Sequence, residues 1–233
     1  MTRRSDSMKI LLIAGHGDGD PGAVGNGYNE ADLTREVATL LKAELDAYAD
    51  VDIADTKKNW YKHIIKQKNS FNFKAYDYVL EIHFNSNTNK SANGTEIYVT
   101  RIEKSHGVET NIVDGVSNIG FYNRGVKCTN FDLIYHIKKQ GVSSALVEMC
   151  FISNKNDIDL YQAKKKDIAK AMAYGIAAGF SLKKRTDELT EACNLLASKG
   201  IINSPEYWAK GKDYSEENTA LLIKKFASYV KGE

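Results

Sequence analysis

An apolar segment that leads directly into a glycine-rich turn constrains the fold of this chain more than any other feature. Residues 9–14, KILLIA, have the composition of a fully buried strand, and the turn GHGDGDPGAVG follows. Residues 30–48 then show the spacing of an amphipathic helix, with an apolar stripe formed by Leu33, Val37, Leu40, Leu41 and Leu45. A buried strand, a loop and a covering helix are the repeating unit of α/β proteins, so we expect a sheet flanked by helices.

The same alternation of strands and helices continues over most of the chain. We expect strands at residues 51–54, 76–85, 95–100 and 144–153, and one in FDLIYHI within residues 125–138. Helices are expected around residues 61–69 and 103–121, and as two stretches within residues 154–182. The pattern predicts an α/β fold with a mostly parallel central sheet flanked by helices, in which ligands bind beyond the carboxyl ends of the strands.

The two ends of the chain depart from this alternation. Residues 1–7 are expected to be a loose leader, because the apolar run that follows is too short for a secretory signal peptide. Residues 8–183 make the main domain, which ends near the basic segment KKRTD. Residues 184–233 are expected to form a small all-helical unit, with helix boundaries at Gly200, Ser204 and Ser215. A unit of this size has little core of its own, so we expect it to pack on the main domain or on a partner.

Charge and apolar content exclude several classes of partner. The 32 basic and 30 acidic residues leave a formal net charge of +2, which gives no overall electrostatic signature for nucleic acid. No apolar segment is long enough to cross a membrane. Cys128, Cys150 and Cys193 are odd in number and far apart, as is typical of a chain folded in a reducing cytosol. We therefore expect a protein made in the cytoplasm, with no signal peptide and no membrane segment.

Two histidines and a glutamate are predicted to meet at one edge of the sheet. His16 lies just past the first strand, Glu30 opens the helix that follows, and His83 lies near the end of a later strand. Two histidines and one carboxylate are a known ligand set for catalytic zinc, which keeps its fourth position for water. The glycine-rich turn could instead hold a phosphate, but Asp18 and Asp20 would repel it and no P-loop Lys-Ser/Thr follows. We therefore favour a site for one zinc ion.

Glu148 is the candidate for the general base. It follows the apolar run SALV at the expected carboxyl end of another strand, where an acid has no structural reason to be buried. A base in this place can take a proton from water and return it to a leaving amine. Glu81 and Asn85 alternate with His83 onto one strand face, so Glu81 is either an outer partner of a histidine ligand or a rival base.

In their order and spacing, several motifs between Lys9 and Leu182 resemble the zinc-dependent N-acetylmuramoyl-L-alanine amidases, especially phage and prophage endolysins. They are AGHGDGDPGA, NEADLTREVATLLKAEL, YVLEIHFNS with NGTEIYV, NRGVK, and ALVEMCFISNKND. The resemblance implies that His16, Glu30 and His83 bind zinc and that Glu148 is the catalytic glutamate. Many relatives begin the first motif with Asp-Pro-Gly-His-Gly-Gly, whereas this chain has IAGHGD, so an outer carboxylate near the metal is expected to be missing.

The resemblance implies hydrolysis of the amide bond between N-acetylmuramic acid and the L-alanine of the stem peptide in bacterial peptidoglycan. A zinc-activated water would attack the carbonyl, and Glu148 would move its proton to the departing nitrogen. Asn85 and Arg124, the latter in NRGVK, are candidates for binding the substrate. Two alternatives stay open. One is a zinc endopeptidase that cuts the stem or cross-bridge peptide, and the other is a cell-wall-binding module without turnover, although such a module has no need of Glu148.

The sequence leaves two roles for residues 184–233. Their acidic and basic residues nearly cancel, so an electrostatic grip on anionic wall polymers is not expected. Tyr207 and Trp208 can stack on sugar rings or form the small core of the unit. We expect either a wall-targeting unit or one that forms a homo-oligomer through its helices. A wall hydrolase made in the cytoplasm then reaches its substrate after release through a pore or by lysis.

Overall fold

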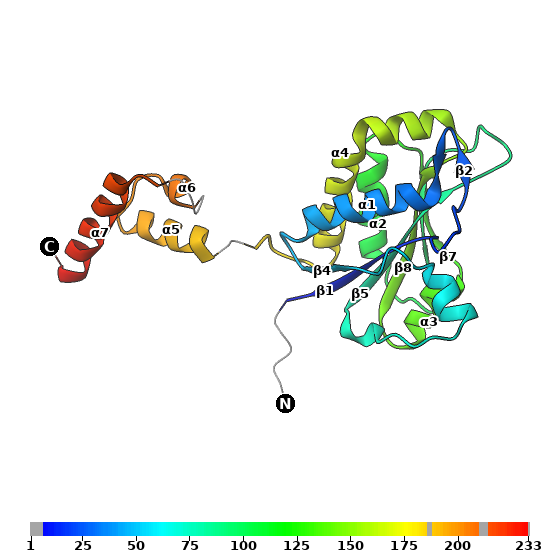
Figure 1. Ribbon diagram of the computed structural model, residues 1–233, viewed down its shortest axis with the longest axis horizontal. Helices are drawn as coiled ribbons and strands as arrows, with labels where there is room; N and C mark the ends of the chain where they lie inside the picture. Colours follow the sequence, from blue (N-terminus) through cyan, green and yellow to red (C-terminus); the bar gives the residue numbers. More distant parts are fainter. Residues whose placement is uncertain (1–6, 186–187, 210–213, 233) are drawn as a thin grey trace. The chain divides into compact units, whose positions relative to one another are not determined.

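The computed structural model describes residues 7–185, 188–209 and 214–232. The expected leader lies mostly outside these ranges. The chain divides after Lys183 into two compact units, which we call the N-terminal unit and the C-terminal unit (Figure 1).

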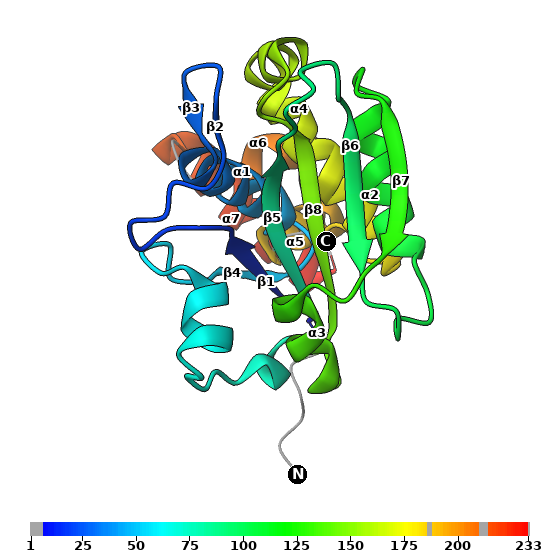
Figure 2. The same cartoon turned by 90° about the vertical axis from the view of Figure 1, so that its right-hand side faces the viewer.

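The N-terminal unit is built on a six-stranded sheet with the strand order β4-β1-β5-β8-β6-β7 (Figure 2). Its strands are β1 (Lys9–Ala14), β4 (Asp50–Ile53), β5 (Tyr78–Asn85), β6 (Thr95–Val99), β7 (Asn123–Cys128) and β8 (Ser143–Phe151). Every neighbouring pair is parallel except β6 and β8, which are antiparallel. This confirms the mostly parallel sheet, and it brings the carboxyl ends of β1, β5 and β8 to one edge. A small hairpin of β2 (Val24–Gly25) and β3 (Tyr28–Asn29) follows β1.

Helices cover the two faces of the sheet unequally. Helices α1 (Glu30–Leu45), α2 (Gly107–Ser117) and α4 (Lys155–Gly179) pack on one face, which we call the core face (Figures 1 and 2). Its apolar cluster joins strand and helix residues that include Leu12, Leu80, Val147, Leu41 and Ile176. The other face, the site face, carries the π-helical turn η1 (Lys62–Lys66), the 3-10 turn η2 (Phe73–Ala75) and α3 (Asp132–Lys139). These elements pack on Leu11, Ile13 and Val79, and beyond them lies an open cleft.

Local sequence explains where α1 begins and which side it buries. The side chain of Asn29 accepts a hydrogen bond from the backbone N–H of Asp32 at 2.9 Å, which caps the helix. The predicted stripe is buried at Leu33, Val37, Leu41 and Leu45, whereas Leu40 is half-buried. The cap therefore places Glu30 in the first turn, at the edge of the sheet where the site lies.

The structure corrects the strand expected in FDLIYHI. Residues 132–139 form helix α3, and the strand of this region is β7, at residues 123–128. The buried side chains of α3 are Leu133, Ile134 and Ile137, a spacing that matches a helical face and not the period of two that a strand requires.

The two helical stretches expected within residues 154–182 are one helix, α4, which begins at the Asn154 cap and has 25 residues. Gly175 does not break it. A Cβ at Gly175 would lie 2.8 Å from the Cα and the N of Ile112 on α2, so this glycine allows the two helices to cross closely. Gly175 is therefore a contact point between α2 and α4.

The C-terminal unit contains α5 (Glu188–Ser198), α6 (Pro205–Trp208) and α7 (Glu216–Lys231). Ser215 caps α7, as predicted, by accepting a hydrogen bond from the backbone N–H of Asn218 at 3.1 Å. Among the described residues of this unit, the buried apolar side chains are Cys193, Ile201 and Ile202, with Trp208 packed against them. The core is small, as expected from the length of the unit.

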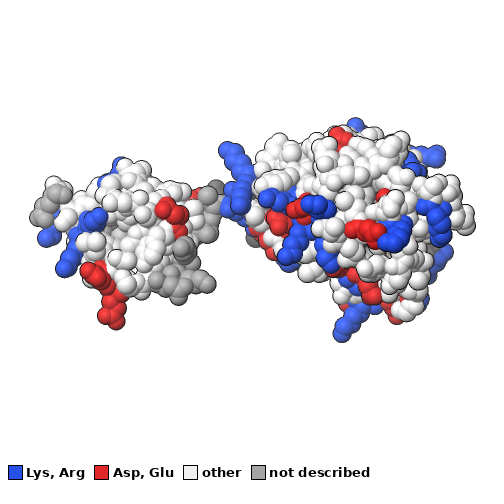
Figure 3. Space-filling view, turned by 90° about the horizontal axis from the view of Figure 1, so that it is seen from above, with Lys and Arg blue, Asp and Glu red and all other residues white. Residues whose placement is uncertain are grey.

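No single charge dominates the surface that Figure 3 draws. Basic and acidic side chains are interspersed over the visible face of the N-terminal unit, in line with the formal net charge of +2. Among the described helices, none is both long and apolar enough to span a membrane. A polymeric partner therefore has to be recognised at a local site.

Candidate metal centre and active site

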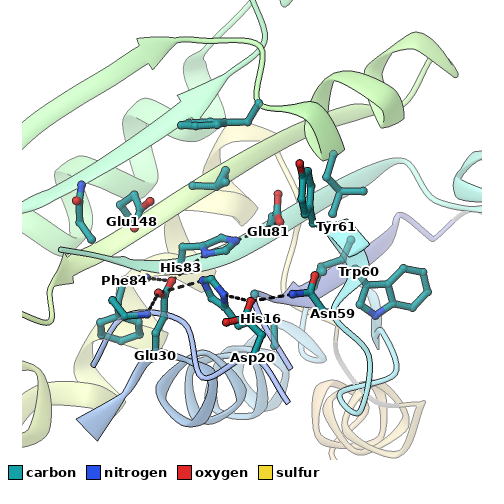
Figure 4. A pocket seen from close by; sticks show the side chains of 18 of the residues that line it. His16, Asp20, Glu30, Asn59, Trp60, Tyr61, Glu81, His83, Phe84 and Glu148 are labelled. Carbon is teal, nitrogen blue, oxygen red and sulfur yellow. Dashed lines mark hydrogen bonds and ion pairs between the residues drawn. The ribbon is translucent and has the colours of Figure 1, made fainter. Parts of the chain in front are cut away.

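The three predicted ligands come together at the carboxyl ends of β1 and β5 (Figure 4). Nε2 of His16 lies 3.0 Å from one carboxylate oxygen of Glu30, and Nδ1 of His83 lies 2.8 Å from the other. One ligand atom from each of the three residues lies within 4.8 Å of the other two. This cluster could hold a metal ion.

Each histidine also contacts a second carboxylate. Nδ1 of His16 lies 2.9 Å from Asp20, and Nε2 of His83 lies 3.1 Å from Glu81. Each imidazole therefore turns one nitrogen to Glu30 and the other to an outer carboxylate, an arrangement that fixes ring orientation and tautomer in metal sites. Asp20 supplies the carboxylate beside His16 even though the first motif lacks the usual aspartate, and Asn59 donates a hydrogen bond to Asp20 at 3.0 Å.

Two glycines of the turn make room for these side chains. A Cβ at Gly15 would lie 2.4 to 2.7 Å from the ring atoms of His83, which Glu30 and Glu81 hold in place. A Cβ at Gly22 would lie 2.7 Å from the Glu30 carboxylate, and its φ of +66° favours glycine. The glycine-rich turn is thus shaped around a histidine–carboxylate cluster.

Arg35 of α1 holds the same turn in place. Its guanidinium donates hydrogen bonds to the carbonyl oxygens of Gly15 and His16, each at 3.0 Å, and to that of Thr56. His16 itself has a φ of 63°, a left-handed conformation that costs energy in a residue other than glycine and occurs at functional sites. Sequence reasoning missed Arg35, because its partners in the turn and at Thr56 lie 19 to 21 residues away along the chain.

Electrostatics in the cluster favour a cation. Burial by itself would raise the pKa of Glu30, but hydrogen bonds from His16 and His83 outweigh burial and hold it well below its ordinary range. Burial would lower the pKa of His83, but hydrogen bonds to Glu30 and Glu81 raise it well above its ordinary value. Without a metal the imidazoles therefore balance the carboxylates, and a divalent cation can take over that role.

Glu148 lies on β8 directly beside His83, its register partner on β5. Its side chain is half-buried, but its Oε2 atom is buried and has no hydrogen-bond partner among the described residues. Burial raises the pKa of the Glu148 carboxyl to about 8, with the carboxylates of Glu30 and Glu96 raising it further against the lowering effect of His83. A carboxyl whose pKa is raised into this range is suited to act as a general acid and base at neutral pH.

A cleft of about 580 Å³ opens over the cluster. Its polar wall carries the two histidines and the carboxylates, and its apolar wall is formed by Trp60, Tyr61, Phe131, Leu133 and Leu146. Figure 4 shows Glu148 and Glu81 on opposite sides of His83, all three close to the cleft. The cleft therefore combines apolar and charged lining.

The two predicted substrate-binding residues share one partner. The amide of Asn85 donates to Glu96 at 2.7 Å, and Nε of Arg124 donates to the other oxygen of Glu96 at 2.7 Å. Asn85 lines the cleft, whereas Arg124 is not among its lining residues. Glu96 is buried, lies opposite Glu148 in the strand register, and also pairs with Lys127. Sequence reasoning missed Glu96. The available signal was the presence of an acidic residue within the β-prone segment TEIYV.

Comparisons of the sequence identify its family. A family model described as N-acetylmuramoyl-L-alanine amidase matches residues 10–178. The N-acetylmuramoyl-L-alanine amidase LytC of Bacillus subtilis is 32% identical over 165 residues, which are 69% of this chain and 33% of that protein. The endolysin of Bacillus phage SPP1 is 25% identical over 189 residues, which are 77% of this chain and 69% of that protein. The chain thus spans about a third of the length of LytC.

Solved structures share the fold. The amidase AmiC2 of Nostoc punctiforme has a TM-score of 0.62 at 21% identity, covering 75% of this chain and 97% of that one. The catalytic domain of the CD27L endolysin, which targets Clostridia difficile, has a TM-score of 0.59 at 24% identity, covering 73% and 97%. With the family match over residues 10–178 and the site at the carboxyl ends of the strands, the chain belongs to the N-acetylmuramoyl-L-alanine amidase family.

Proposed function

We propose that this protein hydrolyses the amide bond between N-acetylmuramic acid and the L-alanine of the stem peptide in peptidoglycan, with one zinc ion bound by His16, Glu30 and His83. The observation that carries the proposal is the placement of Glu148, whose Oε2 is buried without a hydrogen-bond partner, beside a cluster of two imidazoles and one carboxylate. Family membership supports the choice of substrate and bond.

The donor set fits zinc. Imidazole nitrogen and carboxylate oxygen are ligands that zinc prefers, and catalytic sites use three protein ligands. Asp20 and Glu81 hold the proton on the outer nitrogen of His16 and His83, so the inner nitrogens keep their lone pairs. When bound there, zinc acts as a Lewis acid and lowers the pKa of water to about 7.

Residues in and near the cleft transfer the proton and bind the substrate. Glu148 takes a proton from the attacking water as the new carbon–oxygen bond forms, and delivers it to the amide nitrogen as the carbon–nitrogen bond breaks. The products are the lactyl carboxylate of the sugar and a free amino terminus on L-alanine. Asn85 faces the cleft and contacts the substrate, while Arg124 acts through Glu96, which both residues bind.

The reaction determines where the protein acts. Peptidoglycan lies outside the membrane, and one relative is a phage endolysin. We therefore infer that this protein is released to the wall through a pore or by lysis. Residues 184–233 then either target the wall or join copies of the chain, while residues 8–183 carry the catalytic domain.

End-group analysis of purified peptidoglycan tests the proposal. After incubation with the protein we expect new N-terminal L-alanine, no new reducing sugar, and loss of both hydrolysis and product when a chelator is added and their return with zinc. A different new amino terminus would instead identify an endopeptidase that uses the same metal site. Sedimentation of the protein with the wall, with neither product on several wall types, would identify a binding module.

A further inference from the structure

A group of charged side chains borders the cleft on the side of strands β6 and β7, which follow β8 in the sheet (Figure 2). We call it the β6–β7 cluster, and it consists of Glu96, Tyr98, Arg124 and Lys127. Two residues that line the cleft contact it. Asn85 donates a hydrogen bond to Glu96 at 2.7 Å, and the ring of Phe131 lies 4.9 Å from the ring of Tyr98. The cluster is therefore an extension of the cleft wall.

The β6–β7 cluster carries one more positive charge than negative. Glu96 accepts hydrogen bonds from Asn85 and Tyr98 on one oxygen and from Arg124 and Lys127 on the other. Burial would raise the pKa of Glu96, but hydrogen bonds from the two cations hold it below its ordinary value, so the carboxylate stays charged. One carboxylate balances one cation, and a positive charge is left at the border of the cleft.

Lys127 is the cation of this cluster that is better placed to meet a ligand. Its ammonium has three N–H donors, its side chain is 37% exposed, and Nζ lies 5.6 Å from the ring centre of Tyr98. Arg124 is more enclosed, because its side chain is 29% exposed and its guanidinium lies over the ring of Phe151 at 4.9 Å. Lys127 can therefore bind Glu96 and a second acceptor in the cleft together.

The sign of the charge selects one part of the substrate. N-acetylmuramic acid is uncharged when its lactyl group forms the amide bond, whereas residues of the stem peptide carry carboxylates. The acidic residues that line the cleft are Asp20, Glu30, Glu81 and Glu148. They repel a peptide carboxylate, whereas the β6–β7 cluster attracts it. Electrostatics therefore direct the stem peptide over β6 towards β7.

Strand spacing gives the distance between Lys127 and the candidate base. Neighbouring strands lie roughly 4.8 Å apart, and the order β8-β6-β7 puts Lys127 two strands from Glu148. Because Lys127 reaches back to Glu96 on β6, its ammonium lies between one and two spacings, roughly 5–10 Å, from Glu148. An extended peptide advances roughly 3.3 Å per residue. A carboxylate on the residue directly after L-alanine falls in this range.

We propose that Lys127 binds the free carboxylate of the stem-peptide residue that follows L-alanine, and that the protein therefore prefers stem peptides in which this group is not amidated. Glu96 holds the ammonium of Lys127 in place, and Arg124 fixes Glu96. The inference rests on the proposed function, because it names the part of the substrate that the same site recognises.

Turnover of two forms of one substrate tests the proposal. In soluble fragments of purified peptidoglycan, the residue after L-alanine carries either the free carboxylate or the carboxamide, and new N-terminal L-alanine is measured at increasing fragment concentration. For the wild type we expect kcat/KM to be about three- to tenfold higher on the carboxylate form, through a lower KM. Lys127→Met should remove this preference. Lys127→Arg should keep it, because a guanidinium also pairs with a carboxylate.

Lys139→Met is the matched control. Nζ of Lys139 lies 5.7 Å from the ring centre of Tyr135, much as Lys127 lies over Tyr98. Lys139 ends α3, at the opposite end of that helix from the cleft, so this variant should keep the preference for the carboxylate form.

The ratio of the two kcat/KM values separates recognition from a structural role. If Lys127→Met slows both forms equally and the preference remains, Lys127 only stabilises Glu96 and the proposal is refuted. Equal turnover of the two forms by the wild type would also refute it, and would leave the proposed function intact. Hydrolysis of neither form would refute the proposed function, and this inference with it.

Discussion

The two faces of the central sheet are made by the same strands and serve opposite purposes. On β5, Leu80 and Ile82 point to the core face and are fully buried beneath helices. Glu81 and His83, the residues between and after them, point to the site face and meet Glu30 and Glu148 (Figure 4). Neighbouring residues of one strand therefore divide between packing and chemistry.

The difference shows how an α/β protein can hold a charged cluster without losing its core. Side chains alternate across a strand, so an acidic or imidazole residue on the site face does not interrupt the apolar layer opposite. The helices α1, α2 and α4 cover the core face, whereas the site face is open where the strands end. Substitutions on the core face should change stability, and those on the site face should change metal binding and turnover.

Replacing Glu148 by glutamine should have the largest effect. The variant keeps the shape of the side chain and loses the group that transfers the proton, so we expect hydrolysis to fall by about 10³-fold while zinc still binds. Turnover on purified peptidoglycan and zinc titration of the same variant measure the two properties. Full activity of the variant, or loss of zinc, would remove Glu148 from the role of base.

The same variant should be more stable than the wild type when no metal is bound. Because burial raises the pKa of Glu148 to about 8, the contribution of this carboxyl to the stability of the wild type is largest below its ordinary value of 4.5 and is lost as pH rises towards 8. The advantage of Glu148→Gln should therefore grow between these two values. Denaturant unfolding in the presence of chelator at pH 4, 6 and 8 measures it.

Leu80→Ala tests the core face of the sheet. Leu80 is fully buried in the apolar cluster of the core face, so its truncation should lower the free energy of unfolding by about 2–5 kcal/mol. Zinc affinity should remain within severalfold of the wild type, because no ligand or outer carboxylate is touched. A large loss of zinc affinity in protein that is still folded would show that the two faces are coupled.

Asp20→Asn should weaken metal binding by about 10–100-fold with little change in stability. The variant removes the carboxylate that fixes His16 and accepts from Asn59, on a side chain that is 45% exposed. Asp18→Asn is the control, since Asp18 belongs to the same turn but pairs with Lys62. Competition with a zinc chelator compares the two variants, and equal affinities would mean that Asp20 does not orient the ligand.

Local signals in the sequence were enough to predict the centre of the site. His16 and Glu30 flank one turn, and His83 and Glu148 lie near the carboxyl ends of apolar strands, so parallel pairing alone brings them to one edge. Mostly parallel topology could be predicted for the same reason, because strands alternate with helices. The prediction of a strand in FDLIYHI was wrong because the apolar residues of so short a run fit both the period of a strand and that of a helix.

The surroundings of the site could not be predicted, because they depend on pairs distant in sequence. Asn59 reaches Asp20 across 39 residues, and Arg124 reaches Glu96 across 28. The second pair requires β6 to run antiparallel to β8 and parallel to β7, a register that no local pattern contains. Strand periodicity predicts only that Glu96 lies on one face of its strand. The pairing of β6 with β7 and β8 determines which side chains it contacts.

Glu109→Gln should have the smallest effect, and it tests the rule that the core face excludes charge. Glu109 of α2 is buried on this face and accepts a hydrogen bond from the hydroxyl of Tyr78 at 2.9 Å. Burial raises the pKa of the Glu109 carboxyl above its ordinary 4.5, so the folded state loses stability as pH rises through that raised value. Glutamine keeps an oxygen for Tyr78 without the charge, and we expect a gain in stability at pH 7, smaller than the effects above, that disappears near pH 4. Denaturant unfolding at both pH values measures the gain, and a gain of equal size at the two would show that packing, and not charge, separates the variant from the wild type.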